Sequence, residues 1–175
     1  MKFPDVAIRK ILYPTDLSDS ARYAFAYAVS LANQYEAAIT ILHVLTEIPR
    51  LDERIIGYVD AEQWRKIKAD HEKEARHALI GKQRERTVIQ DALHRFAESA
   101  KAGSAFETDE VVVLRGNPVE LILQQCQERN CDLIVMGTHG TGSLADVMLG
   151  STAQRVLRRS PKPVLVIRLP EGGAG

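Results

Sequence analysis

The chain has 175 residues and a mass of 19.5 kDa, which fits one globular domain with a sizeable core better than two. Hydrophobic residues make up 45% and charged residues 26%, which argues against disordered and fibrous classes. Lys and Arg total 23 and Asp and Glu total 23, so the net charge of zero offers no overall attraction to nucleic acid or an anionic membrane. No apolar run approaches the ~18 residues of a membrane span. No secretory signal core follows Met1, and two cysteines cannot build a disulfide framework, so we expect a cytoplasmic protein.

Short apolar runs alternate with helical patterns along the chain, which is typical of βαβ units on a parallel sheet. A first helix is expected after Ser18, a plausible N-cap, and another after Asn117, where Pro118 suits the first helical position. A short helix is expected over residues 151–159. Strands are expected over residues 8–13, 37–45, 110–114, 132–136 and 163–167.

A segment of unusual length, residues 46–108, separates the second expected strand from the third. Residues 49–58 lack a clear period and are expected to form a loop. Residues 61–102 have a helical composition but are too long for one ordinary helix, so we expect a break near Gly81. Residues 65–86 mix basic and acidic side chains at helical spacing, a pattern more typical of a solvated face than of a nucleic-acid site.

Five strands joined by right-handed crossovers predict an α/β fold, a doubly wound parallel sheet in the order 3-2-1-4-5 with helices on both faces. We expect a single domain over residues 1–175, with its core at residues 8–168 and a mobile tail at residues 170–175. In this order strands 1 and 4 diverge at the switch point, and ligands bind beyond their carboxyl ends. Those two ends carry Pro14, Thr15 and Asp16, and Gly137, Thr138, His139 and Gly140.

The second of these ends suits a phosphate. Gly137 and Gly140 can adopt positive φ and allow backbone N–H groups to approach an anion. Gly150, Ser151 and Thr152 then open a helix whose first N–H groups and positive dipole end favour a phosphate, and both hydroxyls can donate further hydrogen bonds. On these residues alone, ordinary turns and a routine helix cap at Ser151 remain the alternative.

The spacing of the glycines is more specific. Gly137 and Gly140, followed after nine residues by Gly150 and Ser151, match the G-2x-G-9x-G-[S/T] pattern of ATP-binding universal stress proteins. The resemblance to the universal stress protein family extends over residues 8–168 and implies a fold like that of the adenine-nucleotide alpha hydrolases. The other matching positions are residues 11–16, Val44, Met136 and residues 161–166.

The resemblance implies a site for ATP, ADP or AMP, with Mg²⁺ or Mn²⁺ as an ion that bridges the phosphates without a protein cage. Asp16 would lie near the ribose or base, and the backbone of Val44 would bond the adenine edge. The implied nucleotide-binding residues are Pro14, Thr15, Asp16, Val44, Met136, Gly137, Thr138, His139, Gly140, Gly150, Ser151 and Thr152. The enlarged segment 46–108 departs from the family's usual length and leaves open which partners reach the site.

The resemblance also implies a homodimer, and the sequence favours one independently, because the last strand is hydrophobic and lies at the edge of the expected sheet. The strand residues that would pair are Val164, Leu165, Val166 and Ile167.

A regulatory, stress-related binding protein is favoured over an enzyme. The chain has no P-loop, no protein-kinase motif, no G-x-G-x-x-G after the first strand, and no acid and base positioned by spacing. We therefore predict no catalytic residue and no metal ligand in the chain. A slow ATP hydrolase or phosphotransferase and a nucleotide-free dimeric scaffold are the two alternatives.

Several single residues have two interpretations. Asp16 could cap the first helix or contact the ligand, and the two roles are compatible. His43 lies in an apolar strand, where a core histidine with one backbone partner is favoured over a catalytic one. Cys126 and Cys131 lack C-x-x-C spacing, so packing is the favoured role of both. Burial against the sheet is favoured for Tyr58 over contact with a partner.

Overall fold

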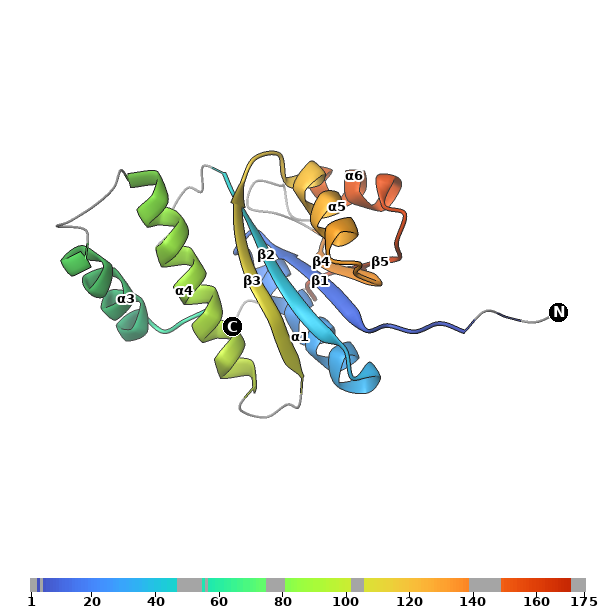
Figure 1. Ribbon diagram of the computed structural model, residues 1–175, viewed down its shortest axis with the longest axis horizontal. Helices are drawn as coiled ribbons and strands as arrows, with labels where there is room; N and C mark the ends of the chain where they lie inside the picture. Colours follow the sequence, from blue (N-terminus) through green and yellow to red (C-terminus); the bar gives the residue numbers. More distant parts are fainter. Residues whose placement is uncertain are drawn as a thin grey trace.

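The computed structural model describes residues 3, 5–46, 55, 57–74, 81–101, 106–138 and 149–170, with the backbone alone for residues 71–74 and 81–84. Five strands form one parallel sheet in the order β3-β2-β1-β4-β5 (Figure 1), which confirms the expected order. The strands are β1 (Lys10–Thr15), β2 (Ala38–Leu45), β3 (Glu107–Arg115), β4 (Leu133–Gly137) and β5 (Val164–Ile167).

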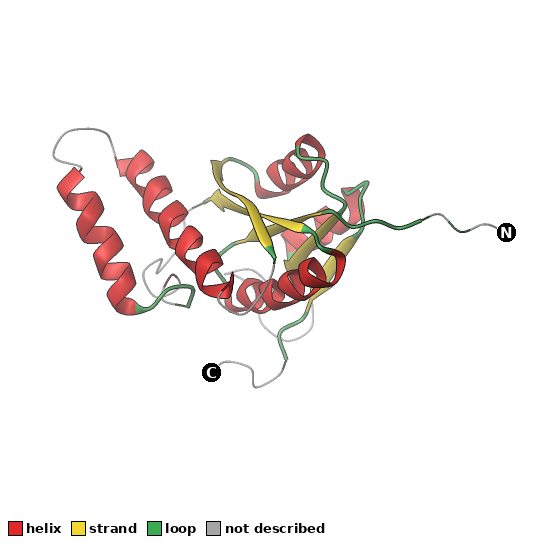
Figure 2. Ribbon diagram, turned by 60° about the horizontal axis from the view of Figure 1, so that its bottom comes forward, coloured by secondary structure: helices red, strands yellow, loops and turns green. Residues whose placement is uncertain are grey.

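Helices cover both faces of this sheet, as Figures 1 and 2 show. One face packs against α1 and α4, and the other against α5 and α6. In the part of the chain that is described, no helix is both long and apolar enough to cross a membrane. The helices are α1 (Asp19–Tyr35), α3 (Ala61–Glu74), α4 (Gly81–Lys101), α5 (Pro118–Glu128) and α6 (Ser151–Arg159).

The long segment between β2 and β3 holds two helices. The second, α4, packs on the sheet and is the crossover helix, while α3 packs against α4 at the outer side of the molecule (Figure 1). The expected break is confirmed, because α3 and α4 are separate helices that pack against each other. Most of the loop expected over residues 49–58 lies outside the described residues. Its last residue, Tyr58, is buried, as expected.

Two strands run farther than their patterns indicated. β1 extends through Pro14 to Thr15 and pairs with β2 up to His43, although Pro14 was expected to end it. The backbone carbonyl of Lys10 points toward β4, and every second residue of the strand points the same way. The backbone of Pro14, four residues later, therefore also faces β4, beyond the last pair of those two strands. Its missing N–H therefore removes no ladder bond. β3 begins at Glu107, three residues before its expected start, and the first two of these added residues pair with the beginning of β2.

Local signals set the helix ends. The hydroxyl of Ser18 accepts a hydrogen bond from the N–H of Ala21 at 3.1 Å and caps α1, as expected. Asn117 caps α5 in the same way, with Pro118 in the first turn. These caps need only neighbouring residues, so the sequence predicts them well.

The two cysteines lie at the end of α5, at its junction with β4. Asn130 has a φ of 53°, and the N–H of Cys131 donates to the carbonyl of Cys126 at 2.9 Å, as in a Schellman motif. That motif brings a buried pair of side chains together, here the two thiols. The packing role predicted for both cysteines is therefore confirmed.

Candidate functional site

The two central strands separate at their carboxyl ends. β1 and β4 are paired at Ile11 with Leu133 and at Leu12 with Ile134, which is the last pair between them in the described residues. β1 continues for three more residues, to Thr15, and stays paired with β2. β4 continues for three more residues, to Gly137, and stays paired with β5. This divergence is the switch point at which ligands bind in open α/β sheets.

The turn that follows β1 supplies one border of this region. The Asp16 carboxylate accepts a hydrogen bond from the N–H of Ser18 at 3.1 Å, which closes a local turn. Because Ser18 caps α1, the interpretation of Asp16 as that cap is wrong. The hydroxyl of Thr15 accepts from the N–H of Leu17 at 3.1 Å, and its side chain is buried. The carbonyl of Thr15 also has a partner, because it accepts a hydrogen bond from His43 Nδ1 at 2.8 Å.

The end of β4 supplies the opposite border, where Gly137 packs against the first turn of α1. A Cβ on Gly137 would lie 2.6 Å from the hydroxyl of Ser20, 2.8 Å from the Ser20 carbonyl carbon and 2.9 Å from the N of Ala21. Among the described glycines, only Gly116 has a positive φ, so Gly137 does not use the backbone freedom we expected of it. The missing side chain instead allows α1 to approach β4.

The N-terminus of α6 lies beside this border. The N–H of Gly150 donates to the carbonyl of Thr138 at 2.7 Å, which ties the start of α6 to the end of β4. Among the described residues no side chain caps α6, and its first turn holds no acidic residue. Its first N–H groups and positive dipole end are thus not neutralised by a side chain of the helix itself, a setting that favours an anion. Ser151 is exposed and Thr152 half-buried.

A charged pair links the other end of α6 to α5. Arg159 donates to both carboxylate oxygens of Glu120 on α5, at 2.6 and 3.2 Å. The Arg159 guanidinium lowers the pKa of Glu120, through this hydrogen bond first and its charge second. Both side chains are exposed, so the pair adds little stability.

The remaining expected site residues divide into three groups. Val44 lies one residue beyond the last pair of β1 and β2. From Val44 onward, β1 therefore no longer runs beside the edge of β2 that faces it. The Met136 side chain lies in the core between the sheet and the helices α5 and α6. His139 and Gly140 lie outside the described residues.

A buried histidine adjoins the β1 end. His43 Nδ1 lies 2.8 Å from the carbonyl oxygen of Thr15, so Nδ1 donates and Nε2 remains an acceptor. Nε2 has no hydrogen-bond partner among the described residues. Burial lowers the pKa of His43, and the Thr15 hydrogen bond and the charges of Asp16 and Glu85 only partly oppose this effect. The prediction of a core histidine with one backbone partner is confirmed.

This lowered pKa predicts a pH-dependent stability. The folded chain keeps His43 neutral, whereas the unfolded chain takes up a proton below about pH 6.5. The free energy of unfolding should therefore be fully retained above about pH 6.5 and decrease toward the folded-state pKa, by at most about 1.4 kcal/mol per pH unit for one proton. Urea unfolding at a series of pH values measures this slope.

Two variants test whether His43 causes this pH dependence of the free energy of unfolding. His43→Gln should flatten the slope, and His94→Gln, which removes an exposed imidazole on α4, should leave it as in the parent chain. An unchanged slope in His43→Gln would show that other groups cause the pH dependence.

The sequence pattern missed two contributors to this region. Ser20 determines the space at Gly137, and Tyr58 reaches the β1 end from 43 residues away in sequence. The residues next to Ser20 and Tyr58 in sequence do not indicate these contacts. Only the packing of α1 and of the long segment brings Ser20 to Gly137 and Tyr58 to Thr15.

Comparison with known proteins finds relatives that match most of this chain. A universal stress protein of Thermus aquaticus, named for its place in the QAH/OAS sulfhydrylase 3′ region, is 32% identical over 161 residues, 91% of this chain and 98% of the relative. Universal stress protein MJ0577 of Methanocaldococcus jannaschii is 28% identical over 169 residues, 93% of this chain and 96% of the relative.

Solved structures show the same fold. The structure of protein MJ0577 matches with a TM-score of 0.63 and 26% identity over 93% of this chain and 97% of that one. A universal stress protein in complex with cAMP matches with a TM-score of 0.60 and 23% identity over 93% and 98% of the two chains. The family model described as "Universal stress protein family" matches residues 7–168. The chain therefore belongs to the universal stress protein family.

Proposed function

We propose that this protein binds an adenine nucleotide, ATP, ADP or AMP, beyond the carboxyl ends of β1 and β4, in a regulatory role in the stress response. The observation that carries the proposal is the separation of β1 from β4 after Leu12 and Ile134, with the start of α6, which no described side chain caps, tied to the same end of β4. The relative solved with cAMP has the same fold, so this fold holds an adenine nucleotide in that protein. The glycine spacing supports the same assignment.

The residues at this end suit the parts of a nucleotide. The N–H groups at Ser151 and Thr152 and their hydroxyls would hold phosphate oxygens. The Asp16 carboxylate and the backbone of Val44 would bond the ribose and the adenine. Mg²⁺ or Mn²⁺ would be held by phosphate oxygens and water rather than by a protein cage.

Two measurements test the proposal. The supernatant of heat-denatured purified protein is analysed by chromatography for a bound adenine nucleotide. Nucleotide-stripped protein is then titrated calorimetrically with MgATP, with MgCTP as the control for recognition of the base. Saturable binding of MgATP in preference to MgCTP is the expected result. Absence of both a resident nucleotide and a titration signal would contradict the proposal.

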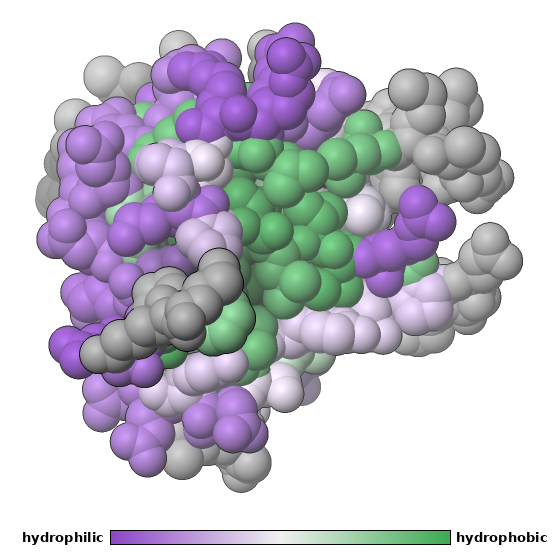
Figure 3. All heavy atoms as spheres, turned by 90° about the vertical axis from the view of Figure 1, so that its right-hand side faces the viewer, coloured by the Kyte–Doolittle hydropathy of each residue, from purple (hydrophilic) through white to green (hydrophobic). Residues whose placement is uncertain are grey.

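We also propose that β5 pairs with its copy in a homodimer. The two sheet edges differ, since β3 carries Glu107, Asp109 and Glu110, whereas β5 has no charged residue. Charges protect an edge from pairing, and an uncharged edge invites it. Figure 3 shows a hydrophobic area on the side of the molecule where β5 lies. A second copy in antiparallel register would cover it about a two-fold axis.

The backbone direction of β5 makes Val166→Pro a specific test. The carbonyls of Pro163 and Ile167 accept bonds from Ile134 of β4 and from Thr138 just after it, so the backbone of Val166, on the alternate side, faces outward. Val166→Pro should therefore remove an outward N–H without removing a bond to β4, and should shift the protein toward monomer. Light scattering at micromolar concentration measures the state, with Val166→Ala as the control that keeps the N–H. A monomeric parent protein would contradict the dimer.

A further inference from the structure

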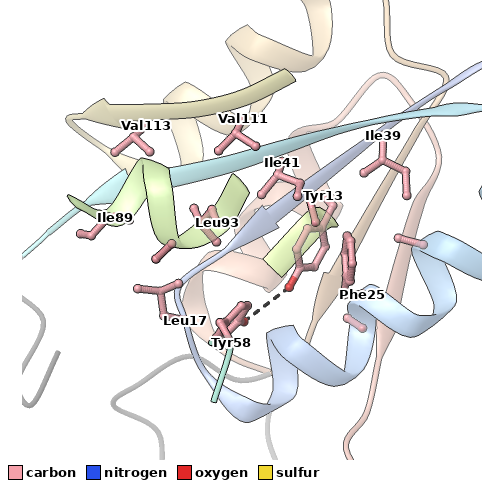
Figure 4. Close-up of a cluster of buried hydrophobic side chains, with 14 of the residues drawn as sticks. Tyr13, Leu17, Phe25, Ile39, Ile41, Tyr58, Ile89, Leu93, Val111 and Val113 are labelled. Carbon is pink, nitrogen blue, oxygen red and sulfur yellow. Dashed lines mark hydrogen bonds between the residues drawn. The ribbon is translucent and has the colours of Figure 1, made fainter. Parts of the chain in front are cut away.

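Tyr58, a residue of the long segment between β2 and β3, reaches the turn that borders the candidate nucleotide site. Its hydroxyl lies 2.8 Å from the hydroxyl of Thr15, 3.2 Å from the carbonyl oxygen of Ser18 and 3.5 Å from the hydroxyl of Tyr13. Figure 4 shows Tyr58 and Tyr13 with their hydroxyls directed toward each other below the sheet. The Tyr58 ring packs on Phe96 of α4, with 4.6 Å between ring centroids.

The protons of this cluster can be assigned, because each hydroxyl has one. Tyr13 donates to the carbonyl of Ala21 at 2.7 Å, and Tyr58 donates to the carbonyl of Ser18. Thr15 accepts from the N–H of Leu17, and it donates its own proton to Tyr58 because the Tyr58 proton goes to Ser18. Burial raises the pKa of Tyr58 above its ordinary value, so the hydroxyl keeps its proton. The bonds run in one direction from Leu17 through Thr15 and Tyr58 to Ser18, an order in which each bond strengthens the next.

These bonds hold both sides of a strained turn. Leu17 has a φ of 62°, a left-handed conformation that costs a bulky residue energy, and its side chain is buried. Tyr58 bonds the residues on either side, Thr15 and Ser18, and Asp16 lies between them. A second bond acts in parallel, since Arg22 of α1 donates to the carbonyl of Gly57 at 2.8 Å. The segment at residues 57–58 therefore fixes the shape of the turn that presents Asp16.

We propose that Tyr58 is a positioning residue of the nucleotide site, and that through it the long segment and the bound nucleotide are energetically coupled. The inference rests on the proposed function, because it assigns a role toward the same ligand. Tyr58 touches no nucleotide atom in this account. It acts through Thr15 and Ser18, which hold Asp16 and the backbone of the turn in the binding geometry.

Coupling of this kind is reciprocal. If the Tyr58 bonds favour the binding geometry of the turn, then bound nucleotide favours the docked position of Tyr58 and of α3, which follows it. Trp64 and Ile67 of α3 are buried in the same core as Tyr58, so the effect reaches the helix. Nucleotide occupancy would thus be sensed by the long segment between β2 and β3.

Tyr58→Phe in the full-length protein is the test, because it keeps the ring on Phe96 and removes only the hydroxyl. Calorimetric titration with MgATP, well below the Tm, is expected to show affinity reduced about three- to tenfold, the range for one or two lost hydrogen bonds. Amide hydrogen exchange over residues 57–70 should slow when MgATP binds the parent protein, and should slow less in Tyr58→Phe.

Two controls separate positioning from packing. Tyr27→Phe removes an exposed hydroxyl from α1 and should leave affinity within roughly twofold. Phe96→Leu keeps the Tyr58 hydroxyl but weakens the ring contact, so it should lower the Tm far more than the affinity. Parent-like affinity in Tyr58→Phe, with exchange over residues 57–70 unaffected by MgATP, would overturn the inference and leave the proposed function intact. A parent protein that binds no MgATP would overturn both.

Discussion

Gly140→Glu is expected to abolish binding of MgATP while the protein stays folded. Gly140 is the second glycine of the spaced pattern, and the protein backbone is expected to approach the nucleotide closely at this residue. A side chain there would occupy ligand space, and its carboxylate would repel the phosphates. Calorimetric titration of the nucleotide-stripped variant measures the loss, and circular dichroism checks the fold.

Graded controls make this result specific. Ser151→Ala removes one hydroxyl at the start of α6 and should weaken binding by about fivefold, on the order of 1 kcal/mol. Lys162→Ala changes an exposed residue between α6 and β5 and should bind as the parent does. If Gly140→Glu binds as tightly as the parent, the glycine pattern is not the phosphate site.

Gly137→Ala is expected to lower the free energy of unfolding by roughly 1–3 kcal/mol, because the new methyl group has no space. It would meet the hydroxyl of Ser20 at 2.6 Å and backbone atoms of Ser20 and Ala21 at 2.8 and 2.9 Å. Backbone atoms in a helix cannot rotate away, so α1 must shift from β4. Urea unfolding monitored by circular dichroism gives the change.

A second substitution tests whether backbone or side chain causes the loss. Ser20→Ala in the Gly137→Ala background removes the hydroxyl but leaves both backbone contacts. Stability should therefore stay low in the double variant, relative to Ser20→Ala alone. Full recovery would mean that only the hydroxyl limits the space, and that the approach of α1 is not what requires glycine here.

The sequence by itself determined the order of the strands and most of the helix ends. Apolar runs at regular intervals, joined by crossovers of one hand, leave few sheet orders, and the order 3-2-1-4-5 places the divergence of β1 and β4 without coordinates. The caps at Ser18 and Asn117 follow from side chains that bond N–H groups two or three residues away. Such local bonds leave a signal in adjacent residues.

Only the tertiary structure decided what holds the candidate site in shape. β1 runs through Pro14 because its ladder with β4 has already ended, and glycine is needed at position 137 because the first turn of α1 lies over it. Tyr58 bonds Thr15 across 43 residues of sequence. No pattern of neighbouring residues records these contacts, since each depends on where a helix or a crossover segment lies once the core has packed around it.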